Sequence, residues 1–215
     1  MVDTAIAGRI GEDVNIAALS IGTTIFNFIY WNCAFLRMGT SGITAQAYGA
    51  GNMKECANML IRALWLAIVL ACVLLIFQKP LGNFSLYVLQ GSETVQQLAG
   101  EYFFARIWAV PASISLFAIQ GWFIGMQDAK TPMMIAILSV IMNAAFSLLF
   151  VFYFNMGIAG IAWGTVVAQY TGLIVSCLLW FIKYRGYMQY FDIKESLHLK
   201  PVAHFLHVNK DIFLR

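Results

Sequence analysis

Polar side chains inside otherwise apolar segments are the residues of this sequence that could do chemistry. Asp3 stands in an apolar run, and Asn143 and Thr165 interrupt two long apolar segments. A carboxyl group at membrane depth can gain and lose a proton near neutral pH, because it is desolvated. Amide and hydroxyl groups at that depth need hydrogen-bond partners. These residues therefore predict proton or cation binding, while a hydrated, external Asp3 remains the alternative.

Spacing adds further polar residues to this set. Ser147 follows Asn143 by one helical turn, and Gln169 follows Thr165 by one turn. Such residues either line a hydrated cavity or hold helices together by hydrogen bonds. The candidates for a substrate cavity are Asn27, Gln120 and Gln169.

The other chemistry-bearing residues predict structural roles. We expect Arg106 to reach the lipid interface or to pair with Glu101, with binding of an anionic substrate as the alternative. His204 and His207 lack the cysteines or carboxylates that would complete a zinc site, so no metal or cofactor is expected. The sequence contains no phosphate-binding or nucleophile motif, and we expect no enzyme. A membrane enzyme would need clustered acids or histidines at the membrane surface.

Five long apolar stretches must position these residues. They run over 14–36, 57–77, 102–125, 132–154 and 157–183. Each is close to the roughly 20 residues with which a helix crosses a bilayer. Only 11% of the 215 residues are charged, against about a quarter in soluble domains. The sequence therefore predicts an all-α, polytopic transmembrane bundle.

Basic residues gather in alternate gaps between these stretches. One side has Arg37, Lys54, Lys130 and the basic tail after 183, and the other has only Arg9 and Lys79. The positive-inside rule makes the first side cytoplasmic and places residues 1–13 outside. We expect a further helix upstream, since an external start without a signal sequence is unusual. The final DIFLR resembles the start of another helix, so a piece of a longer protein is predicted.

Local signals predict the connections. We expect a glycine-rich loop over 37–56, an interfacial helix over 81–100 and a tight hairpin at 155–157. Thr131 is expected to cap the helix that starts at Pro132. We expect Arg62 to extend to the interface. The pairs Gly121–Gly125 and Gly160–Gly164 have the spacing of close helix contacts.

Four segments, taken in order, resemble the multidrug and toxic compound extrusion (MATE) transporters, and within them the branch of the DNA-damage-inducible protein F. They are VDTAIAGRIG (2–11), IFNFIYWNCAFLRMGTSGITAQAYGAG (25–51), ARIWAVPASISLFAIQGWFIGMQDAKTP (105–132) and GIAGIAWGTVVAQY (157–170). The resemblance implies a twelve-helix fold of two six-helix lobes. Residues 1–183 would form the N-terminal lobe, with a truncated first helix, and residues 184–215 a cytoplasmic linker and the start of helix seven.

The resemblance also implies a function. It implies a multi-pass antiporter of the bacterial inner membrane that exports cationic or amphipathic compounds in exchange for protons or Na⁺, with a C-terminal lobe as partner. By motif, Asp3, Asn143, Ser147 and Thr165 would form the coupling site. Ser147 stands where relatives have a second acid, which favours protons over Na⁺. A lipid-linked oligosaccharide flippase of the same fold and an inert fragment remain alternatives.

Overall fold

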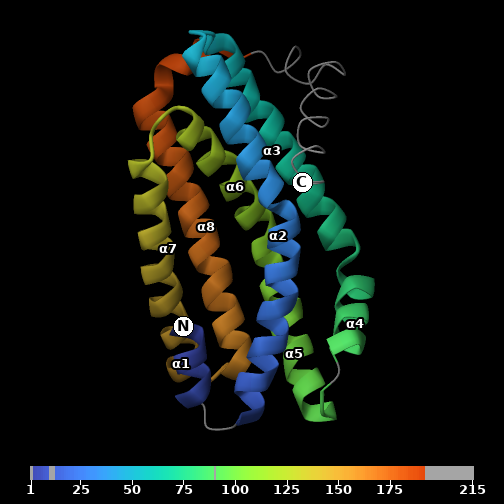
Figure 1. Ribbon diagram of the computed structural model, residues 1–215. Coiled ribbons are helices and arrows are strands. Elements are labelled where there is room, and N and C mark those ends of the chain that lie inside the picture. The colour runs from blue at the N-terminus through green and yellow to red at the C-terminus, as the bar shows by residue number, and fades with distance from the viewer. Residues whose placement is uncertain (1, 10–12, 90, 192–215) are drawn as a thin grey trace. The chain divides into compact units, whose positions relative to one another are not determined.

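The computed structural model describes residues 2–9, 13–89 and 91–191, and its regular elements are all helical (Figure 1). Their bounds are α1 (Val2–Arg9), α2 (Asp13–Gly49), α3 (Met53–Ile76), α4 (Gln78–Leu89), α5 (Glu93–Arg106), the 3₁₀ turn η1 (Ile107–Ala109), α6 (Val110–Gly125), α7 (Lys130–Leu148), the π-helical turn η2 (Leu149–Tyr153), α8 (Gly157–Tyr184) and the 3₁₀ segment η3 (Arg185–Tyr190).

Within the described residues, five helical stretches are long and apolar enough to cross a membrane. They are Asp13–Gly49, Met53–Ile76, Glu93–Gly125, Lys130–Tyr153 and Gly157–Tyr190. Large apolar side chains are exposed along them, as at Trp31, Ile141 and Ile182. A lipid neighbour explains such exposure, because hydrocarbon solvates these side chains as well as a protein core does. The all-α transmembrane bundle and its five complete spans, predicted from the sequence, are confirmed.

The chain forms two compact units, each built from three segments. Unit 1 comprises Met1–Ile29, Ala71–Ala112 and Ile137–Gly172. Unit 2 comprises Tyr30–Leu70, Ser113–Ala136 and Leu173–Arg215. Helices α2, α3, α6, α7 and α8 contribute residues to both units.

An aromatic core holds α5 against α2 in unit 1. The rings of Phe26 and Phe103 stack with centroids 5.3 Å apart. Gly22 faces the buried ring of Tyr102, and Gly82 of α4 faces the ring of Phe103. A side chain at either glycine would collide with these rings, so the glycines permit the close approach. The packing fixes the C-terminal turn of α5, where Arg106 lies.

Unit 2 is organised around Trp122. Its side chain is fully buried, and its indole N–H donates to the Cys56 carbonyl oxygen at 2.7 Å. The Tyr184 ring packs edge-on against it, with centroids 4.9 Å apart. Gly121 and Gly125 of α6 contact α2 directly, since an added Cβ would lie 3.1 Å from the Arg37 Cα or 2.8 Å from the Ser41 carbonyl oxygen. The small-residue spacing predicted from the sequence is confirmed as a helix contact.

The loop predicted over 37–56 is wrong, because α2 continues as a helix to Gly49. Gly121 and Gly125 of α6 pack closely on the backbone of this segment, at Arg37 and Ser41, and so support its helical form. The turn is confined to the residues that follow, where Gly51 has a φ of 70°. The Gly51 amide donates to the Tyr48 carbonyl and the Asn52 amide to the Ala47 carbonyl, which is the Schellman ending of a helix.

The single interfacial helix predicted over 81–100 is also wrong. Two helices, α4 and α5, occupy this segment, and α5 continues through η1 into α6 as one long span, Glu93–Gly125. The 3₁₀ turn η1 ends at Ala109, two residues before Pro111. Proline has no amide hydrogen and its ring crowds the carbonyl four residues earlier, which explains the tightened turn.

Two polar side chains act differently from the sequence prediction. The residue that caps α7 is Asp128, whose Oδ1 accepts the Thr131 backbone N–H at 3.1 Å, so the Thr131 cap was wrong. Arg62 does not extend to an interface. Its side chain is 6% exposed and pairs with Glu55 at 2.5 Å, because two turns of α3 bring the two charges together.

The tight hairpin predicted at 155–157 is confirmed. Asn155 has a φ of 53° and Gly157 a φ of 55°.

Candidate functional site

Unit 1 contains a cavity of about 350 Å³, and residues of α1, α5, α7 and α8 line it. Its lining residues are Asp3, Arg106, Ser139, Val140, Asn143, Thr165 and Gln169. Four of them, Asp3, Asn143, Thr165 and Gln169, are residues that the sequence predicted for the coupling site or the substrate cavity. The fold thus brings together side chains that are up to 166 positions apart, from Asp3 to Gln169.

Asn143 and Thr165 join α7 to α8 at the cavity wall. The Asn143 amide nitrogen donates to the Thr165 hydroxyl oxygen at 2.9 Å. That hydroxyl donates in turn to the Ile161 carbonyl oxygen, one turn earlier in α8, at 3.2 Å. The chain of hydrogen bonds fixes both side chains, so the amide oxygen of Asn143 is held as an acceptor beside the cavity.

Asp3 and Arg106 supply the charges among the described residues that line the cavity. Among the described residues, the buried Oδ1 atom of Asp3 has no hydrogen-bond donor, and the buried Nε atom of Arg106 has no acceptor. Buried polar atoms without partners are rare in folded proteins, and at a cavity they point to a ligand or water. Both atoms therefore have capacity left for a ligand.

Aromatic rings hold the Arg106 side chain in place. Its guanidinium carbon lies 5.0 Å from the Phe26 ring centroid and 5.4 Å from that of Tyr102, and Nη1 donates to the Tyr102 hydroxyl. The expected pairing with Glu101 or extension to the interface is therefore wrong. Tyr102 lies four residues before Arg106 on the same face of α5, and this spacing could have predicted their contact.

Ser147 lies outside the set of cavity-lining residues. It is fully buried between α7 and α8, and its hydroxyl donates weakly to the Ile161 carbonyl oxygen at 3.5 Å. An added Cβ on Gly164 would collide with the Ser147 side chain and backbone. This arrangement fits contact between the helices rather than contact with a substrate.

The remaining sequence candidates are placed elsewhere. Asn27 is exposed on the unit 1 part of α2, and half-buried Gln120 belongs to unit 2. Sequence reasoning missed Ser139 and Val140 as cavity residues. Ser139 precedes Asn143 by one turn of α7, so the same spacing rule that selected Ser147 could have found it. The three histidines lie outside the described residues, as does most of the linker predicted over 184–215.

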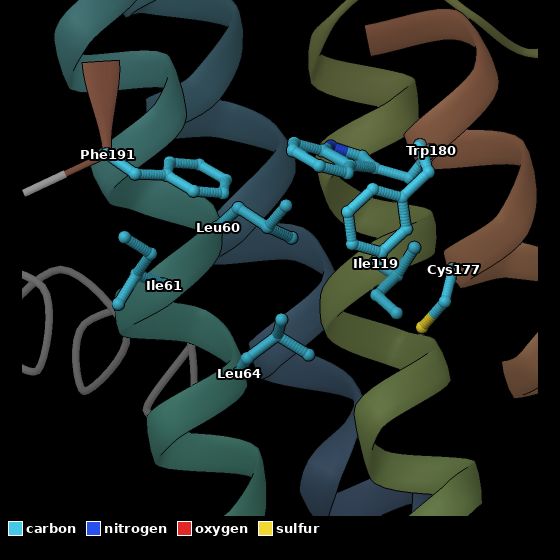
Figure 2. A pocket seen from close by; sticks show the side chains of 8 residues that line it. Leu60, Ile61, Leu64, Ile119, Cys177, Trp180 and Phe191 are labelled. Atoms are coloured by element: carbon cyan, nitrogen blue, oxygen red, sulfur yellow. The ribbon is translucent and has the colours of Figure 1, made fainter. Parts of the chain in front are cut away.

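Unit 2 contains a smaller, apolar cavity of about 170 Å³ (Figure 2). Figure 2 shows Leu60, Ile61 and Leu64 on one side and Trp180 and Cys177 on another. The Phe191 ring stacks on that of Trp180, with centroids 5.2 Å apart. The cavity carries no charged side chain among the described residues, so it offers none of the chemistry of the unit 1 cavity.

Comparison with known proteins agrees with this architecture. The MatE family model matches residues 1–149. Over 217 aligned positions the chain is 30% identical to the DNA damage-inducible protein F of Escherichia coli, covering all of this chain and 47% of that protein. It is 26% identical to a probable multidrug resistance protein NorM of Synechocystis, covering 93% of this chain and 44% of that protein. The chain thus spans about half the length of these relatives.

Solved structures share the fold. A MOP superfamily transporter from Pyrococcus furiosus superposes with a TM-score of 0.86 at 19% identity, over 99% of this chain and 47% of that chain. The inward-facing conformation of a multidrug resistance MATE family transporter superposes with a TM-score of 0.85 at 20% identity, over 99% and 48%. The family model, which matches well over half of the chain, shows that the chain belongs to the MatE family.

Proposed function

We propose that the chain forms the N-terminal lobe of an efflux transporter that exports cationic or amphipathic compounds in exchange for protons. The relatives that carry multidrug resistance names support this class of substrate. The single observation that carries the proposal is the unit 1 cavity, which combines a partly buried carboxyl group with hydrogen-bonding neighbours. A C-terminal lobe would complete the transporter, in the inner membrane of a bacterium.

In the proposed mechanism Asp3 alternates between two charge states. The ionised carboxylate attracts a positively charged group of the substrate into the cavity. Proton uptake removes that charge and releases the substrate as the helices repack. Asn143 and Thr165 would hydrogen-bond either form of the carboxyl group, and Ser147 would hold α7 against α8 during the change. Binding of one proton shifts the equilibrium between the two conformations of the helix bundle only as far as the proton binds one conformation more tightly than the other.

Asp3 is the single carboxylate that lines the cavity among the described residues, and this favours protons as the coupling ion. Na⁺ is held best by several oxygen ligands that include negative charge. Ser147, which stands where relatives are expected to have a second acid, is buried in the helix contact. Coupling to Na⁺ is therefore the second choice, and transport under separate proton and Na⁺ gradients in proteoliposomes decides between them.

The substitution Asp3→Asn tests the mechanism in the complete transporter. Asn keeps the size of the side chain but cannot exchange a proton, so we expect export of a cationic dye from cells to fall to background at unchanged protein levels. Asp13→Asn is the matched control, because Asp13 is exposed in the first turn of α2. Dye export that survives Asp3→Asn would contradict the proposal.

A lipid-linked oligosaccharide flippase is the second candidate, favoured by one observation. Arg106 lines the cavity and could bind a phosphate. A pyrophosphate headgroup, however, carries more negative charge than one guanidinium neutralises. Translocation of a labelled pyrophosphate lipid in vesicles, absent in matched empty vesicles, would support the flippase over the efflux pump.

A further inference from the structure

We propose that Arg106 is an anion-recognising residue of the unit 1 cavity, and that the preferred substrate is a zwitterionic amphiphile. This inference rests on the proposed transport function and narrows its substrate class. The observation that carries it is a guanidinium and a carboxylate that line one cavity. Each has a buried polar atom without a hydrogen-bond partner among the residues that the structure describes.

The Arg106 guanidinium is preorganised for a ligand. The Phe26 and Tyr102 rings support it at 5.0 and 5.4 Å, and the Tyr102 hydroxyl accepts one of its hydrogen bonds. A guanidinium has five N–H donors in a rigid plane, so several remain for an anion. Its planar fork suits two parallel hydrogen bonds to a carboxylate, sulfonate or phosphate oxygen pair. Little side-chain entropy is lost on binding, because the rings already restrict the side chain.

The charge of the lining residues argues against a purely cationic substrate. Arginine stays protonated throughout the physiological range. The described lining residues therefore carry no net charge when Asp3 is ionised and one positive charge when it is protonated. Tyr102, whose hydroxyl accepts a hydrogen bond from Arg106, is a further titratable side chain, and phenol groups ordinarily carry no charge near pH 7. A monocation gains from Asp3 but is repelled by Arg106 in either state.

A zwitterion satisfies both charges at once. Its cationic group would bind the Asp3 carboxylate and its anionic group the Arg106 guanidinium, while the neutral side chains of Ser139 and Gln169 line the space between helices. The volume of about 350 Å³ lies at the lower end of the range for small-molecule sites, which suits a dipolar head group. When Asp3 is protonated, Arg106 is the remaining charged side chain among the described lining residues. Its positive charge would then repel the cationic group of the substrate.

Three fluorescent probes with the same alkyl chain test this inference. They are a dansyl alkyl betaine, a dansyl alkyl-trimethylammonium and a dansyl fatty acid, titrated onto the purified chain in lipid nanodiscs. We expect the betaine to bind tightest. Arg106→Gln should weaken betaine binding roughly tenfold and strengthen binding of the trimethylammonium probe, because it removes one charge-assisted contact and one repulsion. Arg37→Gln, which removes an exposed arginine of α2, should change neither.

Several outcomes would overturn the inference. Equal betaine affinity in the wild type and Arg106→Gln would do so, as would tighter binding of the trimethylammonium probe than of the betaine to the wild type. In the second case cation export, measured separately through Asp3→Asn, would still stand. Arg106→Lys keeps the charge without the planar fork and should bind the betaine with intermediate affinity, which tests the site even if Arg106→Gln folds poorly.

Discussion

At Gly164 helix α8 lies so close to α7 that no side chain fits between them. A Cβ at this position would lie 2.6 Å from the Ser147 backbone nitrogen and 2.7 Å from its Cα. These are backbone atoms, which cannot move aside as the end of a flexible side chain can. The contact lies one residue from Thr165, so its exact spacing also sets where the Asn143–Thr165 hydrogen bond forms.

Gly164→Ala should therefore destabilise the chain, by about 1–3 kcal/mol, because overpacking forces the two helices apart. Gly42→Ala is the matched control. Gly42 lies in α2 with open space around it, and alanine there should stabilise the helix by about 0.5–1 kcal/mol. Unfolding of both variants in mild detergent, followed by circular dichroism, measures the difference. Equal stability of the two variants would contradict the close contact.

Single residues also mark how far the site could be predicted. Asp3, Asn143, Thr165 and Gln169 were found because a polar group inside an apolar span needs a partner, and helical spacing puts such groups on one face. Arg106 was assigned wrongly, since an arginine near the end of a span usually reaches the interface. Its true support comes partly from Phe26, which is 80 positions away, and no local pattern contains that contact.

The turn between α6 and α7 shows how one side chain organises an element boundary. Gln127 adopts a φ of 61°, and the amides of Gln127 and Asp128 close the end of α6 on the Ile124 and Phe123 carbonyls. The Asp128 carboxylate then accepts the Thr131 amide at 3.1 Å and the Thr131 hydroxyl at 2.6 Å. Lys183 of α8 lies 3.2 Å from the same carboxylate. The end of α6, the start of α7 and the end of α8 thus meet at one group.

Asp128→Ala should cost about 1 kcal/mol of stability, a typical value for the loss of a helix cap. Asp128→Asn keeps a side-chain oxygen that can accept the Thr131 amide but loses the ion pair with Lys183. It should be affected less, because Lys183 is 42% exposed and solvent screens the pair. Thermal unfolding of both variants ranks them, and a larger loss in Asp128→Asn would contradict the capping role.

The same carboxylate predicts a pH dependence. Partial burial acts to raise the pKa of Asp128, but hydrogen bonds from the Thr131 hydroxyl and amide and from Lys183 outweigh it and lower the pKa to about 2 from 3.8. The carboxylate therefore stabilises the fold fully above about pH 4 and loses this effect as the pH falls towards 2. The stability difference between wild type and Asp128→Asn should shrink over that interval, as thermal unfolding in acidic buffers would measure.

Element boundaries were the least predictable feature. The five spans followed from length and hydropathy alone, but the end of α2 did not. Gly42 and Gly49 looked like turn residues, whereas the turn needs a left-handed residue only at Gly51. The helical continuation is supported from outside this segment, because Gly121 and Gly125 of α6 pack directly on its backbone at Arg37 and Ser41. That neighbour is distant in the sequence, so local propensity could not decide.

At the scale of the whole molecule, the spans and basic residues predict an orientation. Three spans separate Ala50, between α2 and α3, from Met156, between α7 and α8, so the two positions should face opposite sides of the membrane. The positive-inside rule places Ala50 in the cytoplasm. In spheroplasts a membrane-impermeant maleimide should label Met156→Cys, and Ala50→Cys only after permeabilisation. The reverse pattern would contradict the orientation.

The burial of Ser147 restricts how this lineage can change. A carboxylate at this position would need space that Gly164 leaves too small, and it would place a second charge inside a dry helix contact. A substitution of Ser147 by an acid would therefore disrupt the contact between α7 and α8 before it could add a cation ligand. An acid at this position would require compensating changes in α7 and α8 together, so we expect close descendants of this chain to keep a small side chain here.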